Sequence, residues 1–125
     1  MKRIMTGLSL ALLATVSSCT EEELEQDKNV LIRVENVSDY DFDQVVVNTT
    51  GGEEGYGTVP SGAVSSYQAY EFAYSFATVE LRILGSKFTF NPIDYTGETR
   101  LANGSYTYQV DVDNFADRSL TLRLK

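Results

Sequence analysis

Apolar and polar residues alternate along most of the chain that follows residue 28. The clearest alternation lies in four runs: residues 30–34, 76–84, 106–112 and 120–124. Because successive side chains of an extended strand point to opposite faces, a period of two predicts strands with one buried face. No run in this part of the chain has the period of an amphipathic helix, so the pattern predicts β-strands.

Shorter runs predict the remaining strands and turns. Three such runs predict further strands: residues 45–47, which are all β-branched, and residues 56–59 and 63–69. Four glycines within residues 49–57 predict a hairpin connection or a loose loop, since glycine adopts positive φ angles at low steric cost. Gly85 and Ser86 precede a short run at residues 87–90 and predict a two-residue hairpin turn with glycine first.

Strands at intervals of about 8 to 12 residues, joined by turns, are typical of a sandwich of antiparallel sheets. Residues 29–125 are enough for one domain, and a chain of this size buries sufficient apolar surface to fold without a metal or a disulfide. We therefore expect an all-β fold, with a single antiparallel β-sandwich domain over residues 29–125.

The entry to one predicted strand resembles a feature of known sandwiches. Leu101, Gly104 and Tyr106 resemble the tyrosine corner of immunoglobulin-like and fibronectin-like domains, where a tyrosine hydroxyl at a strand start bonds back to the preceding turn. Transthyretin-like sandwiches have a similar Gly-x-Tyr entry into a strand. The resemblance implies an immunoglobulin-like or a transthyretin-like sandwich and leaves both open.

The first 18 residues have the layout of a cleaved secretion signal. Lys2 and Arg3 form a basic start, residues 4–16 are mostly apolar or small, and two serines precede Cys19. This apolar stretch is shorter than the roughly 20 residues that a membrane-spanning helix needs. The pattern predicts a signal peptide over residues 1–18.

The string from Val16 to Cys19, an aliphatic residue followed by two serines and a cysteine, resembles the lipobox of bacterial lipoproteins. The resemblance implies cleavage before Cys19, a diacylglyceryl thioether on its thiol and an acylated new amino terminus. Several acyl chains on one residue anchor a protein firmly, because each buried methylene contributes about 0.8 kcal/mol. The alternative is an ordinary secretion signal in which Cys19 stays unmodified.

The residues after Cys19 are strongly acidic. Residues 20–27 are mostly Glu and Asp, and such a run stays solvated, so residues 19–28 predict a flexible tether. The run resembles the export signal of surface lipoproteins of the Bacteroidota, and the whole chain resembles small uncharacterised lipoproteins of that group. The resemblance implies a lipid anchor in the outer membrane and exposure at the cell surface. A tether without an export role is the alternative.

Charge and composition restrict the chemistry further. The formal net charge is −8 at pH 7 and becomes −10 when Lys2 and Arg3 leave with the signal peptide. An acidic chain does not bind nucleic acid through phosphate contacts, and its membrane contact is left to the acyl chains. The chain has no histidine, and Cys19 is its single thiol, which excludes Ser-His-Asp and Cys-His catalysis and His or Cys zinc sites. We expect no enzyme activity and no cofactor.

Aromatic residues are densest between residues 67 and 76. The candidate ligand-binding residues are Tyr67, Tyr70, Phe72 and Tyr74. In an extended strand alternate rings of this stretch, continuing to Phe76, share one face, and an exposed row of rings stacks on sugar rings. The alternative, which the pattern favours, is that the rings fill the sandwich core.

Two groups of acidic residues are weaker candidates. Asp39, Asp41 and Asp43 alternate with aromatic residues and are a weak Ca²⁺ candidate, because Ca²⁺ prefers several oxygen ligands. A solvated loop is the favoured alternative, since the glycine and the distal glutamate of a known calcium loop are missing. Asp94 and Glu98 resemble the acid and base of a glycoside hydrolase only in residue type, and a connecting loop is the simpler interpretation.

These observations predict a lipid-anchored, exported lipoprotein that acts as a non-catalytic binding or structural module at the cell envelope. Its expected contacts are the membrane, through the acyl chains on Cys19, and an envelope protein or a glycan. The alternative is a carbohydrate-binding surface component of a glycan-capture system that uses the aromatic residues between 67 and 76.

Overall fold

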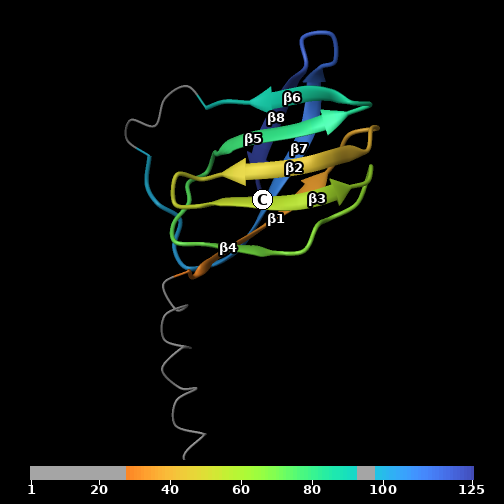
Figure 1. Ribbon diagram of the computed structural model, residues 1–125. Helices are drawn as coiled ribbons and strands as arrows, with labels where there is room; N and C mark the ends of the chain where they lie inside the picture. Colours follow the sequence, from red (N-terminus) through yellow and green to blue (C-terminus); the bar gives the residue numbers. More distant parts are fainter. Residues whose placement is uncertain (1–27, 93–97) are drawn as a thin grey trace, which may run out of the picture.

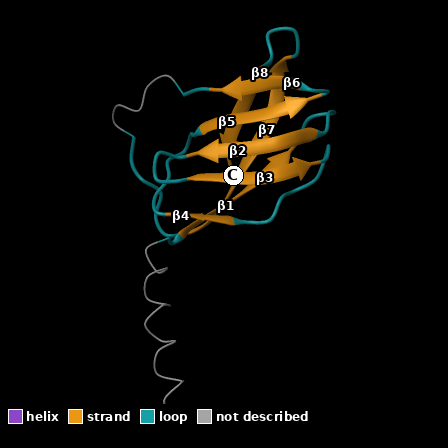
Figure 2. Cartoon of the chain, in the orientation of Figure 1, coloured by secondary structure: helices purple, strands orange, loops and turns teal. Residues whose placement is uncertain are grey.

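The structure is a computed structural model that describes residues 28–92 and 98–125. Those residues form eight strands and no helix (Figures 1 and 2). Within the described ranges, therefore, no helix has the length and apolar character needed to cross a membrane. Residues 1–27, which include Cys19 and nearly all of the predicted tether, and residues 93–97 lie outside the described part.

The strands are numbered along the chain, and all belong to one sheet. Their bounds are β1 Val30–Asn36, β2 Phe42–Asn48, β3 Glu53–Val59, β4 Gln68–Tyr70, β5 Thr78–Ile83, β6 Ser86–Phe90, β7 Gly104–Asn114 and β8 Ser119–Leu124. Neighbouring strands follow the order β3-β2-β5-β6-β8-β7-β1-β4. Strands far apart in the sequence, such as β1 and β7, are therefore direct neighbours.

The sheet folds over into two crossed layers. Figure 1 shows β6, β5, β2 and β3 in front, with β8, β7 and β1 crossing behind them. A single residue pair, Thr89 with Ser119, links β6 to β8 where one layer passes into the other. At the opposite edge β4 approaches β3, and Gln68 Nε2 donates a hydrogen bond to Gly55 O at 3.1 Å. The sheet is thus nearly closed into a barrel-like shape.

The all-β prediction is confirmed, but the expectation of purely antiparallel pairing is wrong for two strand pairs. β1 runs parallel to β7, with Val30–Asn36 paired to residues 104–110, and β6 runs parallel to β8. β1 and β7 start at the same end of the molecule, where Gly104 N donates a hydrogen bond to Asn29 O at 3.1 Å. Side chains alternate in both kinds of pairing, so the period of two does not distinguish them.

The inner faces of the two layers enclose a continuous apolar core. The predicted alternation is confirmed in β5, where Val79, Leu81 and Ile83 are all buried. β1 likewise alternates between buried and half-buried positions along its whole length. Tyr70 and Tyr108 are the largest fully buried side chains. Each large aliphatic side chain buried here contributes about 1.5–3 kcal/mol to the hydrophobic stabilisation.

Three strands differ from their predicted extent. β2 starts before the predicted residues 45–47, because a bulge at Gln44, with a φ of 51°, lets the strand continue across an irregular position. β3 starts within the predicted glycine loop, because its backbone pairs with β2 there. Residues 63–69 form only β4 and one isolated bridge. Between them Ser65 Oγ accepts a hydrogen bond from Val34 N at 2.9 Å, in place of a regular ladder contact.

The turn between β5 and β6 lies one residue earlier than predicted. Ile83 pairs with Ser86, so Leu84 and Gly85 are the two turn residues. Their φ angles are 52° and 83°, and positive φ at both positions is what a type I′ turn requires. The prediction with glycine first is therefore wrong, because Leu84 adopts a conformation that usually favours glycine or asparagine.

The hydrogen bond predicted at the start of β7 is confirmed. Tyr106 OH donates to Ala102 O at 2.7 Å, across the turn that precedes the strand. Gly104 lies between them with a φ of 149°, a conformation that favours glycine. The contact joins the start of β7 to the turn before it.

Candidate functional site

The outer face of β1, β7 and β8 carries polar side chains in register across the three strands. Glu35 of β1 lies opposite Gln109 of β7, and Gln109 in turn lies opposite Arg123 of β8. The next outward pair is Asp111 with Thr121. Residues paired across neighbouring strands have Cβ atoms about 4.5–5.5 Å apart, so these side chains form one contiguous polar surface.

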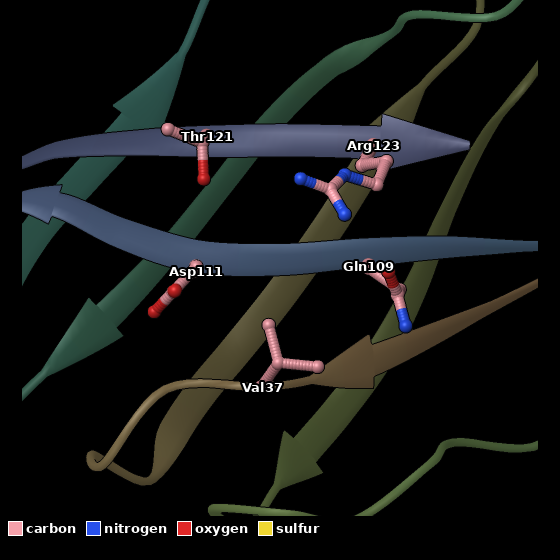
Figure 3. Close-up of a pocket in the computed structure, with 5 residues that line it drawn as sticks. All are labelled: Val37, Gln109, Asp111, Thr121 and Arg123. Atoms are coloured by element: carbon pink, nitrogen blue, oxygen red, sulfur yellow. The ribbon is translucent and has the colours of Figure 1, made fainter. Parts of the chain in front are cut away.

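This face has a hollow of about 280 Å³. Its lining residues are Val37, Gln109, Asp111, Thr121 and Arg123 (Figure 3). It forms where β1 ends. Val37 N donates a last hydrogen bond to Val110 O at 3.0 Å, after which the chain leaves the sheet. The face therefore narrows from three strands to two beside Asp111, and a shallow cavity remains.

One side of the hollow is held by contacts among its neighbours. Gln109 Nε2 donates a hydrogen bond to Glu35 Oε1 at 3.0 Å, and Lys125 Nζ lies 3.7 Å from the same oxygen. The hydrogen bond from Gln109 lowers the pKa of Glu35 below its usual value. Burial opposes this shift, and the contact with Lys125 and the charge of Arg33 lower the pKa further. Glu35 is therefore an ionised support for Gln109.

The other side of the hollow leaves polar groups unused. Asp111 Oδ1 accepts a hydrogen bond from Val112 N at 2.7 Å, and its second carboxylate oxygen has no hydrogen-bond donor within residues 28–92 and 98–125. The guanidinium of Arg123 extends over the gap between β8 and β7 (Figure 3). Among the described residues, nothing forms a hydrogen bond or an ion pair with Arg123 or with the hydroxyl of Thr121. These side chains are open to a polar ligand.

The aromatic residues predicted as ligand-binding are not gathered into one row. Tyr70 is fully buried. Its hydroxyl lies 2.9 Å from that of Tyr56, which also donates to Ile32 O at 2.9 Å. Burial raises the pKa of Tyr56 to about 12 and raises the pKa of Tyr70 as well. Tyr70 is therefore a core residue, and its hydroxyl belongs to a buried tyrosine pair.

The other three rings lie in different surroundings. Tyr67 is 41% exposed, with the guanidinium of Arg33 5.1 Å from its ring centre. Phe72 is half-buried beneath Arg100, whose guanidinium lies 3.7 Å from the ring centre. Tyr74 meets Phe72 edge to face, with 5.9 Å between the ring centres. Residues 71–77 are not a strand, so alternate rings do not share a face. Ligand binding by Tyr67, Phe72 and Tyr74 stays a prediction.

The acidic candidates are also separated. Asp41 Oδ1 accepts a hydrogen bond from Ser61 N at 2.9 Å, and Asp43 Oδ1 accepts one from Thr58 Oγ1 at 3.2 Å. Neither is grouped with Asp39 in the geometry of a cation site, and within the described ranges no three acidic, histidine or cysteine residues could hold a metal ion.

Two candidates from the sequence fall outside the site. Asp94 lies outside the described residues, so its distance from the half-buried Glu98 is not described. Cys19 also lies outside them, and its lipidation stays a prediction.

Sequence reasoning missed three polar residues of the hollow: Gln109, Thr121 and Arg123. The alternation in β7 and β8 assigns them correctly to an outer face, and the pairing of a hairpin predicts that they are neighbours. The position of Val37 beside them depends on the parallel β1–β7 pair, which local pattern does not reveal.

These features define the protein as an all-β domain with a polar hollow on one outer sheet face. No family model matches the chain, and no curated protein matches its sequence. Its fold is similar to that of an NMR structure of a protein from Eubacterium rectale, with a TM-score of 0.54. The similarity covers 78% of this chain and 91% of that chain at 19% sequence identity, and it shows the fold alone.

Proposed function

We propose that the chain is a lipid-anchored, exported lipoprotein of the outer membrane, exposed at the cell surface, that acts there as a non-catalytic binding module. The basic and apolar leader, the string that ends at Cys19 and the acidic run after it support the anchor and the location. The two crossed layers support a β-sandwich of the immunoglobulin-like or transthyretin-like kind as the finer description of the fold.

The observation that carries the binding role is the hollow with Arg123, which has no hydrogen-bond or ion-pair partner in the part of the chain that the structure describes. β1 is the first strand after the predicted tether in the sequence, and the hollow lies at the far end of β1, beside Val37. Seven residues of strand at about 3.3 Å each place the hollow roughly 20 Å farther along the domain. The length of β1 therefore separates the hollow from the start of the domain.

The hollow also favours binding over catalysis. Asp111 is the single carboxylate among the described residues that line it, whereas glycoside hydrolysis by acid and base uses two carboxyl groups flanking the bond. The sequence has no histidine to move a proton near neutral pH.

The anchor is tested by the change Cys19→Ala in the full chain expressed in a bacterium. We expect the wild-type protein in the membrane fraction and the variant in the soluble fraction, because the thiol that carries the lipid is missing. Ser17→Ala is the matched control and keeps Cys19. Equal membrane partitioning of both variants would refute the lipid anchor.

The binding face is tested by a photo-crosslinking amino acid introduced in place of Thr121, with irradiation of intact cells. The control carries the same group in place of Glu80, which lies exposed on the outer face of β5 in the other layer. We expect adducts at position 121 and not at position 80. Equal labelling of both positions, or none, contradicts the assignment of the face.

The alternative function, carbohydrate capture by the aromatic stretch, loses Tyr70 to the core. Tyr67 keeps an exposed ring, but the guanidinium of Arg33 already lies over that ring. The chemistry of the hollow offers a different place for a sugar.

A further inference from the structure

The unused groups of the hollow are a mixture of donors and acceptors. Arg123 offers the N–H groups of its guanidinium, and Asp111 offers one carboxylate oxygen. Gln109 gives one N–H to Glu35 and keeps its carbonyl oxygen and its second N–H. The hydroxyl of Thr121 serves either way. A polyhydroxylated molecule has the same property, because each of its hydroxyl groups both donates and accepts a hydrogen bond.

The charges of the hollow favour a neutral ligand. Arg123 and Asp111 contribute one positive and one negative charge, and the nearby Glu35 is already compensated by Lys125. The carboxylate of Asp111 would repel a phosphate or sulfate group, and Arg123 is the one cation among the described lining residues, whereas anion-binding sites gather several cationic groups. The guanidinium of Arg123 would repel a cation. A ligand without net charge avoids both repulsions and uses both charged side chains as strong hydrogen-bond partners.

The hollow also has an apolar wall. Val37 is 43% exposed and borders the polar groups. A pyranose ring has hydroxyl groups at its edge and apolar C–H groups on its faces. The wall and the polar groups therefore suit the two kinds of surface on one sugar ring.

We propose that the hollow binds one neutral sugar residue of a glycan, with Arg123 and Asp111 bound to neighbouring hydroxyl groups and Val37 against a C–H face. This inference rests on the proposed binding role of the β1, β7 and β8 face and names its ligand class. The volume of about 280 Å³ lies just below the usual range for pockets that hold a whole ligand, roughly 300–1,000 Å³, and fits one residue of a longer chain.

The test uses the full chain in detergent and saturation-transfer NMR. The neutral probes are maltohexaose, cellohexaose, xylohexaose and mannohexaose, and hexagalacturonate is the anionic probe. We expect transfer to at least one neutral probe and none to the anionic probe. Arg123→Gln and Asp111→Asn should each weaken binding of that probe about tenfold, as expected for the loss of one charge-assisted hydrogen bond.

Matched controls separate the site from a general effect of charge. Arg82→Gln and Glu80→Gln remove the same charges from the outer face of β5 and should leave binding unchanged. The proposal is overturned if no neutral probe binds, if hexagalacturonate binds more tightly, or if the control variants weaken binding equally. If position 121 still cross-links to a protein while no sugar binds, the sugar proposal fails and the binding face stands.

Discussion

Tyr56 and Tyr70 close the edge of the sheet where β3 and β4 approach each other without backbone pairing. Their hydroxyl oxygens lie 2.9 Å apart, and Tyr56 also donates to Ile32 O of β1 at 2.9 Å. Tyr70 has a second, longer acceptor in Val47 O of β2, at 3.4 Å. The tyrosine pair therefore connects four strands. Removal of either hydroxyl tests whether these bonds hold the barrel-like shape together.

The expected magnitudes follow from the partners that remain. Tyr56→Phe leaves the buried hydroxyl of Tyr70 with only its long contact to Val47 O, and an unsatisfied buried group costs about 1–3 kcal/mol. Tyr70→Phe costs less, about 1 kcal/mol, because Tyr56 keeps its bond to Ile32 O. In the double variant the free energy of unfolding should fall by less than the sum of the two single losses, since each single change removes the same hydrogen bond between the two tyrosines.

The assay is equilibrium unfolding of the full chain by urea and by heat. For a domain of this size, 1 kcal/mol corresponds to a change in Tm of about 4–8 °C. Tyr67→Phe is the matched control, because this tyrosine is 41% exposed, and its change should stay within about 0.5 kcal/mol. If Tyr56→Phe costs no more than Tyr67→Phe, or if the two single losses simply add, the reasoning about the tyrosine pair is wrong.

Three further predictions concern stability. Burial raises the pKa of Tyr56 from 10.0 to about 12, so the unfolded chain loses this proton first. The contribution of the protonated Tyr56 to the free energy of unfolding is therefore complete below about pH 10 and falls as the pH rises toward 12. Urea unfolding across this pH range measures the fall, and an equally steep fall in Tyr56→Phe contradicts the prediction. Leu84→Asn should raise the free energy of unfolding by about 0.5–1 kcal/mol, because Leu84 has a φ of 52° and is 85% exposed; an unchanged or lower Tm contradicts this. Gly51→Ala should lower the free energy of unfolding by about 1–3 kcal/mol in the same assay, since its Cβ would lie 2.2 Å from Phe72 O. Gly55→Ala is the control and should be tolerated, because its Cβ would lie 3.9 Å from the nearest atom, Val45 O. Equal effects of the two changes contradict the predicted clash.

The sequence pattern predicted which way side chains face, because alternation is a local property of an extended chain. Val79, Leu81 and Ile83 were correctly assigned to the core for this reason. Strand partners were not predictable in the same way. The pairing of Val30 with Gly104 joins positions far apart in the sequence, and its parallel direction depends on how the whole sheet folds over. The sandwich was expected to be antiparallel because short strands at intervals of about 8 to 12 residues, joined by turns, are typical of that fold.

The aromatic stretch shows a similar limit. Density of rings does not decide between a core and a surface, because the choice depends on where the strand ends. β4 ends at Tyr70, with its ring inside the core, and the chain then changes direction, so Phe72 and Tyr74 meet each other instead of alternating along a face. A sequence signal for that ending is the bulky, mixed composition of residues 71–77, which lacks the β-branched residues of the longer strands.

A polar side chain on the outer face of a strand is ambiguous, since water and a ligand both satisfy it. What separates the two cases here is whether neighbouring strands already satisfy its hydrogen-bonding groups. Arg33 Nε donates to Thr107 Oγ1 at 3.0 Å across the β1–β7 pair, whereas Arg123 has no such partner among the described residues. β7 supplies the partner of Arg33, whereas on the row of Arg123 the amide of Gln109 donates to Glu35 instead. On the next row, beside Asp111, β1 has ended. A binding surface therefore begins on this face where the strand pairing stops, and only the three-dimensional pairing shows where that is.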